Sequence, residues 1–184
     1  MPAARLHAGD ALTIGRVALT PIFVWTFAAG ISGDAIAGVA AGVLFALLAA
    51  SDYFDGILAR RATRASARGR VWDSCADIFF IESALVEAVY LDLVPWWVPA
   101  SIGASFAYYV LDSWCRARGT AGLTLLSSRL GHIGGICNYV LVGVLTYNEA
   151  AGIHLLGRGI LYLLYCLVPI YSLGSVATRI AGRL

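Results

Sequence analysis

The chain has 184 residues, of which 60% are hydrophobic and 13% are charged, and its mean hydropathy is +0.79. This composition is too apolar for an ordinary soluble domain and is typical of an integral membrane protein. The net charge of +2 is too small to indicate nucleic-acid binding, so we expect no nucleic-acid partner. We predict a single all-α membrane domain over residues 1–184.

Apolar segments recur along the chain at lengths near the roughly 20 residues that cross a bilayer. They predict six transmembrane helices, at Leu12–Ala29, Ala35–Leu58, Val71–Leu93, Trp96–Cys115, Ile133–Tyr147 and Leu155–Val176. A short interfacial helix within Pro2–Gly15 could precede the first span.

Arginine predicts the orientation of the six spans. The chain has no lysine, and in this topology 12 of its 13 basic residues lie on one side, leaving Arg158 on the other. The positive-inside rule then places both termini, and the connection between the second and third spans, on the cytoplasmic side. We expect the arginine-rich side to meet anionic lipid headgroups or phosphorylated substrates at a bacterial or archaeal inner membrane.

The connection between the second and third spans carries four aspartates, in "SDYFDGILARRATRASARGRVWDSCADIFF". Asp52 and Asp55 are three residues apart, and Asp73 and Asp77 are four apart, so each pair lies on one helix face. Because the connection is short, we expect the two helices to be antiparallel neighbours with converging acidic faces. A divalent cation would offset the repulsion between the carboxylates. Oxygen ligands without histidine or thiolate favour Mg²⁺, Mn²⁺ or Ca²⁺ over zinc.

Neighbouring residues suit a pyrophosphate substrate. Gly56 lets a ligand approach the helix backbone, Arg60 offers a planar fork of donors to phosphate, and Ser66 adds a hydroxyl. Together with a metal ion, they predict a phosphate-binding site at the membrane surface.

The spacing of Asp52, Asp55-Gly56, Ala59-Arg60, Gly69, Asp73 and Asp77 resembles the signature of the CDP-alcohol phosphotransferase (CDP-alcohol phosphatidyltransferase) family. The signature covers residues 52–77. The segment "DALTIGRVALTP", Asp10–Pro21, is similar to the family's entry into its first helix, and the six-span layout also agrees.

The resemblance implies a transferase that moves a phosphatidyl group from CDP-diacylglycerol to a small alcohol and releases CMP, as a step of phospholipid biosynthesis. It implies Mg²⁺ or Mn²⁺, as two ions, with Asp77 also acting as the general base. The implied metal ligands are Asp52, Asp55, Asp73 and Asp77. The implied CDP-lipid site comprises Asp10, Ala11, Leu12, Thr13, Gly56, Arg60 and Ser66.

The acceptor must bind outside the signature. A basic cluster between the fourth and fifth spans could hold a phosphorylated acceptor such as glycerol 3-phosphate, or could simply face lipid headgroups; it comprises Arg116, Arg118, Arg129 and His132. "SDYFDGILAR" is similar to phosphatidylglycerophosphate synthases. However, the residues after Asp73 lack that subfamily's proline and lysine, and "SSRLGHIGGICNY" lacks its lysines. Inositol phosphate or another alcohol therefore remains an alternative acceptor.

Other polar or small residues allow rival interpretations. Intramembrane acids also occur in small cation or proton transporters, although here the four signature aspartates gather at one face. Glu82 and Glu87 could extend a hydrophilic cavity or pair inside the bundle, and Asp112 has the spacing to pair with Arg116. The small residues of Gly38–Gly42 fit either a contact within the bundle or a homodimer, which we predict.

Overall fold

The computed structural model describes residues 8–61, 67–116 and 129–181, with side chains described for residues 12–51, 71–115 and 131–181. The described chain is all-helical and contains no strand, which confirms the predicted class. The helices are α1 (Ala8–Ile31), α2 (Ala35–Arg61), α3 (Ala67–Tyr90), α4 (Trp97–Arg116), α5 (Arg129–Leu145), the π-helix η1 (Thr146–Ala150) and α6 (Arg158–Ala181).

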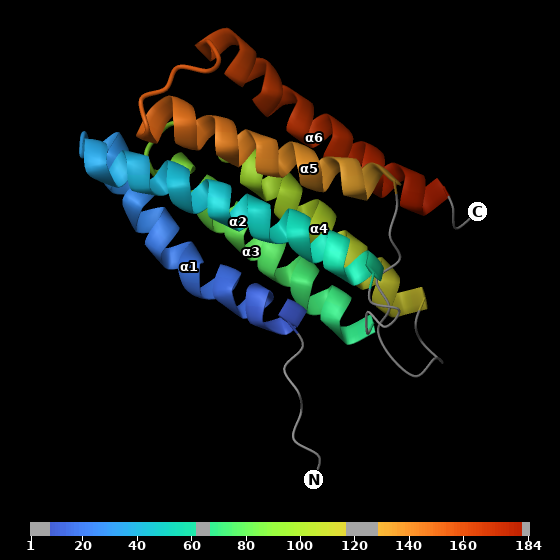
Figure 1. Ribbon diagram of the computed structural model, residues 1–184. Coiled ribbons are helices and arrows are strands. Elements are labelled where there is room, and N and C mark those ends of the chain that lie inside the picture. The colour runs from blue at the N-terminus through green and yellow to red at the C-terminus, as the bar shows by residue number, and fades with distance from the viewer. Residues whose placement is uncertain (1–7, 62–66, 117–128, 182–184) are drawn as a thin grey trace.

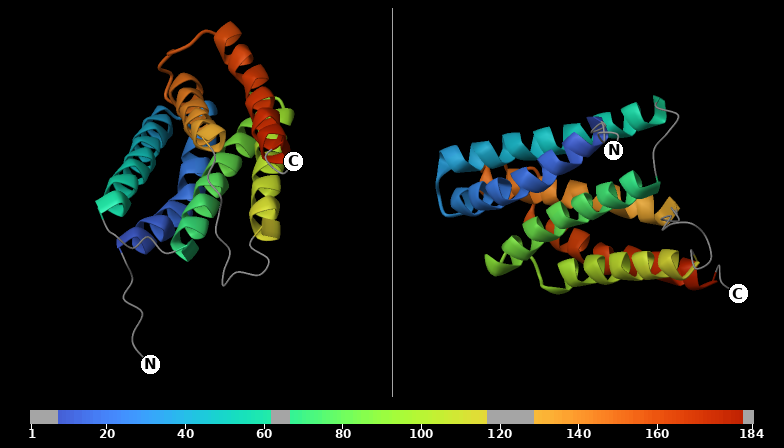
Figure 2. Two further views of the ribbon diagram at one scale, coloured as in Figure 1. Left: turned by 90° about the vertical axis from the view of Figure 1, so that its right-hand side faces the viewer. Right: turned by 90° about the horizontal axis from the view of Figure 1, so that it is seen from below.

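The helices form one bundle in which successive long helices run in opposite directions (Figures 1 and 2). As a result, the start of α1 and the end of α6 lie at the same end of the bundle. The ends of α2 and α4 and the starts of α3 and α5 lie there too, and we call this the site end.

Local chemistry sets the turn between α1 and α2. Gly33 has a φ of 103°, a left-handed conformation that glycine adopts without a steric penalty. The next residue, Asp34, caps α2: its Oδ1 accepts hydrogen bonds from the backbone N–H groups of Ile36 and Ala37, each 3.0 Å long. This turn lets α2 fold back tightly along α1.

The packing of α2 and α3 differs from the sequence prediction. Their directions are antiparallel, as expected, but in the described part of the chain their backbones are not neighbours; α1 packs against both. They meet through side chains, with the rings of Phe45 and Phe80 stacked 6.4 Å apart between centroids. A short connection favours neighbours, but here α1 lies against both helices.

Glycines at the end opposite the site allow close packing. A Cβ added to Gly38 would overlap the carbonyl oxygen of Ala150 in η1, and one added to Gly30 would lie 2.6 Å from the Cα of Gly38. Gly42 faces Tyr147, whose hydroxyl donates a 3.1 Å hydrogen bond to the Gly42 carbonyl. The small-residue segment Gly38–Gly42 therefore serves a contact within the bundle.

Many large apolar side chains face outward. On α6, for example, Ile170 is 64% exposed and Leu173 is 69% exposed. Leu12–Ile31 and Arg158–Ala181 are long and apolar enough to cross a bilayer, and these are the two such helices among the described residues. Such outward apolar faces indicate a membrane protein.

Candidate active site

The acidic face of α3 lies at the site end of the bundle. Asp73 and Asp77 are one helical turn apart, and their side chains are 40% and 28% exposed, respectively. The two carboxylates are therefore reachable by a ligand but are not fully solvated. The structure brings this predicted pair onto one face, as the spacing requires.

Helix α1 supplies a positive charge to both acids. Arg16 has a fully buried side chain, and its Nη1 contacts Oδ1 of Asp77 and lies 3.4 Å from Oδ1 of Asp73. One turn earlier, the Thr13 hydroxyl donates a 3.4 Å hydrogen bond to the same Asp73 oxygen. Thr13 was expected at the nucleotide site, and the structure places it against the acidic face. The sequence analysis grouped Arg16 with the other arginines of the predicted cytoplasmic side, although it is the one charged residue between Asp10 and Asp34.

Tyr139 brings α5 to the same carboxylate. Its hydroxyl donates a 3.1 Å hydrogen bond to Oδ1 of Asp77. Its ring stacks on Phe80, which is fully buried and packs on Phe23 of α1, with ring centroids 5.7 and 5.0 Å apart. These packed rings in the core fix the position of the Tyr139 ring and so orient its hydroxyl toward Asp77. Sequence analysis missed Tyr139, although it lies seven residues after His132 and hence on the same face of α5.

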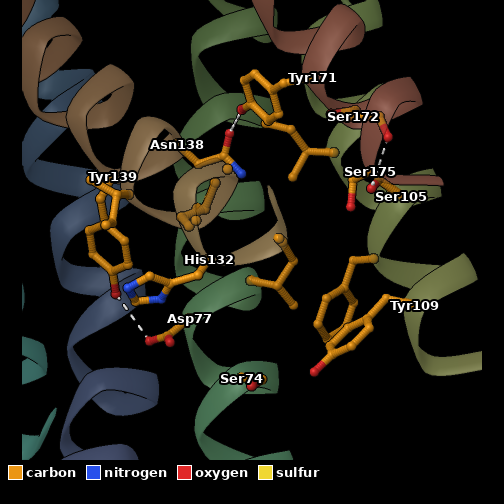
Figure 3. Close-up of a pocket in the computed structure, with 18 of the residues that line it drawn as sticks. Ser74, Asp77, Ser105, Tyr109, His132, Asn138, Tyr139, Tyr171, Ser172 and Ser175 are labelled. Atoms are coloured by element: carbon orange, nitrogen blue, oxygen red, sulfur yellow. Dashed lines mark hydrogen bonds between the residues drawn. The ribbon is translucent and has the colours of Figure 1, made fainter. Parts of the chain in front are cut away.

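A cavity of about 440 Å³ opens beside Asp77, between α3, α4, α5 and α6 (Figure 3). These helices form a ring, in which α3 packs on α4, α4 on α6, α6 on α5, and α5 on α3. The volume is in the range of small-molecule sites. The polar lining residues are Ser74, Asp77, Ser105, Tyr109, His132, Asn138, Tyr139, Tyr171, Ser172, Ser175 and Arg179.

Polar side chains line this cavity on more than one side. Tyr171 donates a hydrogen bond to Oδ1 of Asn138, which joins α6 to α5. His132 points toward Tyr139 and Asp77, so the predicted acceptor residue lies at the same part of the cavity as the carboxylate. The cavity can therefore bind a hydroxylated ligand through several hydrogen bonds.

Arg179 gives the cavity a positive charge, although the sequence analysis grouped it only with the other arginines of the predicted cytoplasmic side. It is 9% exposed, lies 3.5 Å from Oδ2 of the buried Asp112, and its guanidinium carbon is 4.3 Å from the centroid of the Tyr109 ring. Asp112 thus forms an ion pair with Arg179 across two helices. Its pairing with Arg116 on the same helix stays a prediction, because the Arg116 side chain lies outside those described. The spacing of residues within α4 could not predict a contact between Asp112 on α4 and Arg179 on α6.

Glu82 does not line the cavity beside Asp77. It lies at a second, open cavity of about 370 Å³ formed by α3 and α4, together with Trp96 and Gly103. Its Oε1 atom is buried and accepts no hydrogen bond from the described residues. The cavity at Glu82 is thus a separate one with otherwise apolar lining, and not an extension of a hydrophilic cavity at Asp77.

Several predicted site residues lie outside the described side chains. Those on helices whose backbone is described are Asp10, Ala11, Asp52, Asp55, Gly56, Arg60, Arg116 and Arg129. Ser66 and Arg118 lie outside the described residues altogether. Leu12 is described and half-buried on α1. The convergence of Asp52 and Asp55 with the α3 acids stays a prediction.

The described part of the site suits a hard cation. No group of three or more potential metal ligands occurs among the described side chains, because half of the predicted set is not among them. However, Oδ1 of Asp73 and Oδ1 of Asp77 both approach one nitrogen of Arg16, so two anionic oxygens converge on a single positively charged point. Converging carboxylate oxygens are the donor set that Mg²⁺ and Mn²⁺ accept.

Fold and site together define a helical membrane protein with an acidic centre beside a polar cavity. A family model described as CDP-alcohol phosphatidyltransferase matches residues 6–170. The chain belongs to this family, which confirms the resemblance in the sequence and favours an enzyme over a transporter.

Named relatives match over part of the chain. It is 36% identical to a "Cardiolipin synthase (CMP-forming)" of Streptomyces coelicolor, over 47% of this chain and 40% of the relative. It is 36% identical to a "Probable phosphatidylglycerophosphate synthase" of Mycobacterium tuberculosis, over 52% and 46%. It is 31% identical to the "CDP-diacylglycerol--glycerol-3-phosphate 3-phosphatidyltransferase" of Bacillus subtilis, over 52% and 55%. The matches therefore span about half the length of these relatives.

Proposed function

We propose that the protein transfers a phosphatidyl group from CDP-diacylglycerol to a small alcohol, with glycerol 3-phosphate as the acceptor, and releases CMP. The observation that carries this proposal is the cavity whose lining includes both the Asp77 carboxylate and the buried Arg179 guanidinium. A carboxylate can accept the proton of an acceptor hydroxyl, and an arginine can hold the acceptor's phosphate. The names of two relatives support the same acceptor.

In the proposed reaction, the acceptor hydroxyl lies beside Asp77 and attacks the lipid-side phosphorus of the donor. Its proton passes to the Asp77 carboxylate as the new O–P bond forms and the P–O bond to CMP breaks. Tyr139 and Arg16 hold the carboxylate in place through contacts with Oδ1. Most of the acceleration comes from positioning the acceptor beside the donor.

A divalent cation would be held by Asp73 and Asp77 together with Asp52 and Asp55, and the chemistry it supplies is neutralisation of the phosphate charge that develops during transfer. We propose Mg²⁺ or Mn²⁺, as two ions. The family as a whole is divalent-metal dependent. Asp10–Thr13, Gly56, Arg60 and Ser66 are proposed to bind the CDP-lipid.

The arrangement in the membrane is part of the proposal. Six spans, with the site end and both termini in the cytoplasm, would place the acids where a soluble acceptor and CMP exchange with the cytoplasm. Labelling the cysteines near the site end, from one or the other side of sealed vesicles, would test this orientation. The homodimer also stays a prediction. Gly38 and Gly42, the residues that suggested it, pack against other residues of the same chain and so do not support it.

The experiment that tests the function measures CMP release by the purified protein from CDP-diacylglycerol. The acceptors are glycerol 3-phosphate, inositol phosphate, inositol, serine and phosphatidylglycerol, each with Mg²⁺ and with EDTA. We expect release with glycerol 3-phosphate that EDTA abolishes, and none from the Asp77→Asn variant, which should still bind the CDP-lipid. Faster release with inositol phosphate would establish the alternative acceptor. No metal-dependent release with any acceptor would reject the proposed function.

A further inference from the structure

Arg16 is a charged side chain buried inside an apolar helix. Its side chain is 0% exposed, and its neighbours along α1 are almost all apolar. A buried guanidinium in a membrane helix requires a counter-charge. Here the counter-charges are Asp73 and Asp77 of α3, both contacted through Nη1. Arg16 thus ties the first helix to the acidic face.

The atoms that Arg16 contacts belong to two of the carboxylates proposed as metal ligands. Nη1 touches Oδ1 of Asp77 and lies 3.4 Å from Oδ1 of Asp73, so a single nitrogen occupies the point where the two oxygens converge. Thr13 and Tyr139 donate neutral hydrogen bonds to these two oxygens, one each. Only Arg16, among these three partners, brings a positive charge.

We infer that Arg16 is a built-in counter-cation that holds Asp73 and Asp77 together in the metal-free protein and competes with the divalent metal for their oxygens. This inference rests on the proposed function, in which the two aspartates are metal ligands. Arg16 is in this sense a positioning residue: it acts on the acidic face and need not touch substrate.

Two opposite effects follow from the charge of Arg16. In the metal-free protein, removing it takes away the positive charge that Arg16 supplies to two carboxylates one turn apart, so the protein should unfold more easily. In the metal-bound protein, the arginine repels the divalent ion at short range in a poorly solvated site, so removing it should strengthen metal binding. A residue with a merely structural role would weaken both states.

The test compares four variants with the unchanged protein in lipid nanodiscs. Arg16→Met removes the charge, Arg16→Gln removes it but keeps a hydrogen-bond donor, and Arg16→Lys keeps the charge. Thr13→Val is the matched control, because it removes a neutral hydrogen bond to the same Asp73 oxygen. Mn²⁺ binding is measured by electron paramagnetic resonance, and thermal unfolding is measured in EDTA and in saturating Mg²⁺.

For Arg16→Met and Arg16→Gln, we expect Mn²⁺ affinity to rise by about tenfold. In EDTA, both variants should unfold at a lower temperature than the unchanged protein. Adding Mg²⁺ should raise their unfolding temperature by more than it raises that of the unchanged protein. Arg16→Lys and Thr13→Val should bind Mn²⁺ within about threefold of the unchanged protein. If Arg16→Met does not fold, Arg16→Gln alone serves as the variant without the positive charge.

Unchanged or weaker Mn²⁺ binding in both neutral variants, with binding by the unchanged protein intact, would overturn the inference and leave the proposed function standing. Failure of the unchanged protein to bind Mn²⁺ would overturn the metal site and this inference with it. The two failures are therefore distinguishable in one titration.

Discussion

Tyr139 on α5 donates a 3.1 Å hydrogen bond to the carboxylate of Asp77 on α3, which joins the wall of the cavity to the acidic face. The Tyr139 ring is held separately, by stacking on Phe80. The hydroxyl and the ring therefore have different roles, and a substitution can remove one without the other.

Tyr139→Phe should lower kcat for CMP release by about ten- to a hundredfold, because a hydrogen bond to a charged group contributes about 1.5–3 kcal/mol. The ring contact with Phe80 remains, so the unfolding temperature should change little. Tyr171→Phe is the matched control, because it removes a cavity hydrogen bond to Asn138 and leaves Asp77 untouched. Equal losses of kcat in both variants would show that the contact with Asp77 has no special role.

Arg179→Gln should raise the KM for glycerol 3-phosphate by at least about tenfold, because a charge-assisted contact with phosphate is lost. The KM for CDP-diacylglycerol should stay within about twofold, because the α3 acids and their partners are unchanged. Asp112→Asn should show a smaller effect in the same direction, since it only loosens Arg179. Parallel kinetics with both substrates check this prediction, and equal increases in both KM values would contradict it.

His132→Ala should raise the KM for the acceptor more than that for the donor, because His132 lines the cavity. Arg129→Ala is expected to act in the same direction. His154→Ala is the control, because His154 is exposed in the connection between η1 and α6 and does not line the cavity. A KM effect of His132→Ala no larger than that of His154→Ala would assign His132 to the lipid-facing surface.

Gly38→Ala should destabilise the bundle by about 1–3 kcal/mol, because a Cβ there overlaps the Ala150 carbonyl and the backbones of α2 and η1 must separate. Gly174→Ala is the control on α6, where an added Cβ meets no atom within 4 Å. That variant should be neutral or slightly more stable, given the higher helix propensity of alanine. Unfolding followed by circular dichroism in detergent measures both. A neutral Gly38→Ala variant would show that the close approach can relax at no cost.

The sequence predicted what depends on local spacing. Helix positions followed from apolar segments, and Asp73 and Asp77 share a face because they are four residues apart. What it missed are contacts between helices distant in sequence. Arg16 meets Asp77 61 residues away, and nothing in the local pattern of α1 names that partner. An arginine in an otherwise apolar span was nevertheless a signal that some acid must lie opposite it.

The same reason explains what the sequence missed in the packing. Asp112 was matched with Arg116 because pairs four residues apart are visible in the sequence, and that pair stays a prediction because the Arg116 side chain lies outside those described. The contact of Asp112 with Arg179 comes from the packing of α4 on α6. Likewise, the short connection between α2 and α3 suggested direct packing, and only the assembled bundle shows α1 against both.

The ring of helices around the cavity divides the molecule into two parts that can vary separately. Within the described part of the chain, the backbone of α6 packs against α4 and α5 and not against α1, α2 or α3. Substitutions on α4 and α6 can therefore enlarge, narrow or recharge the cavity while the contacts of Arg16 and Thr13 with the α3 acids stay as they are. Under selection, such a bundle can exchange one acceptor for another without rebuilding its reaction centre.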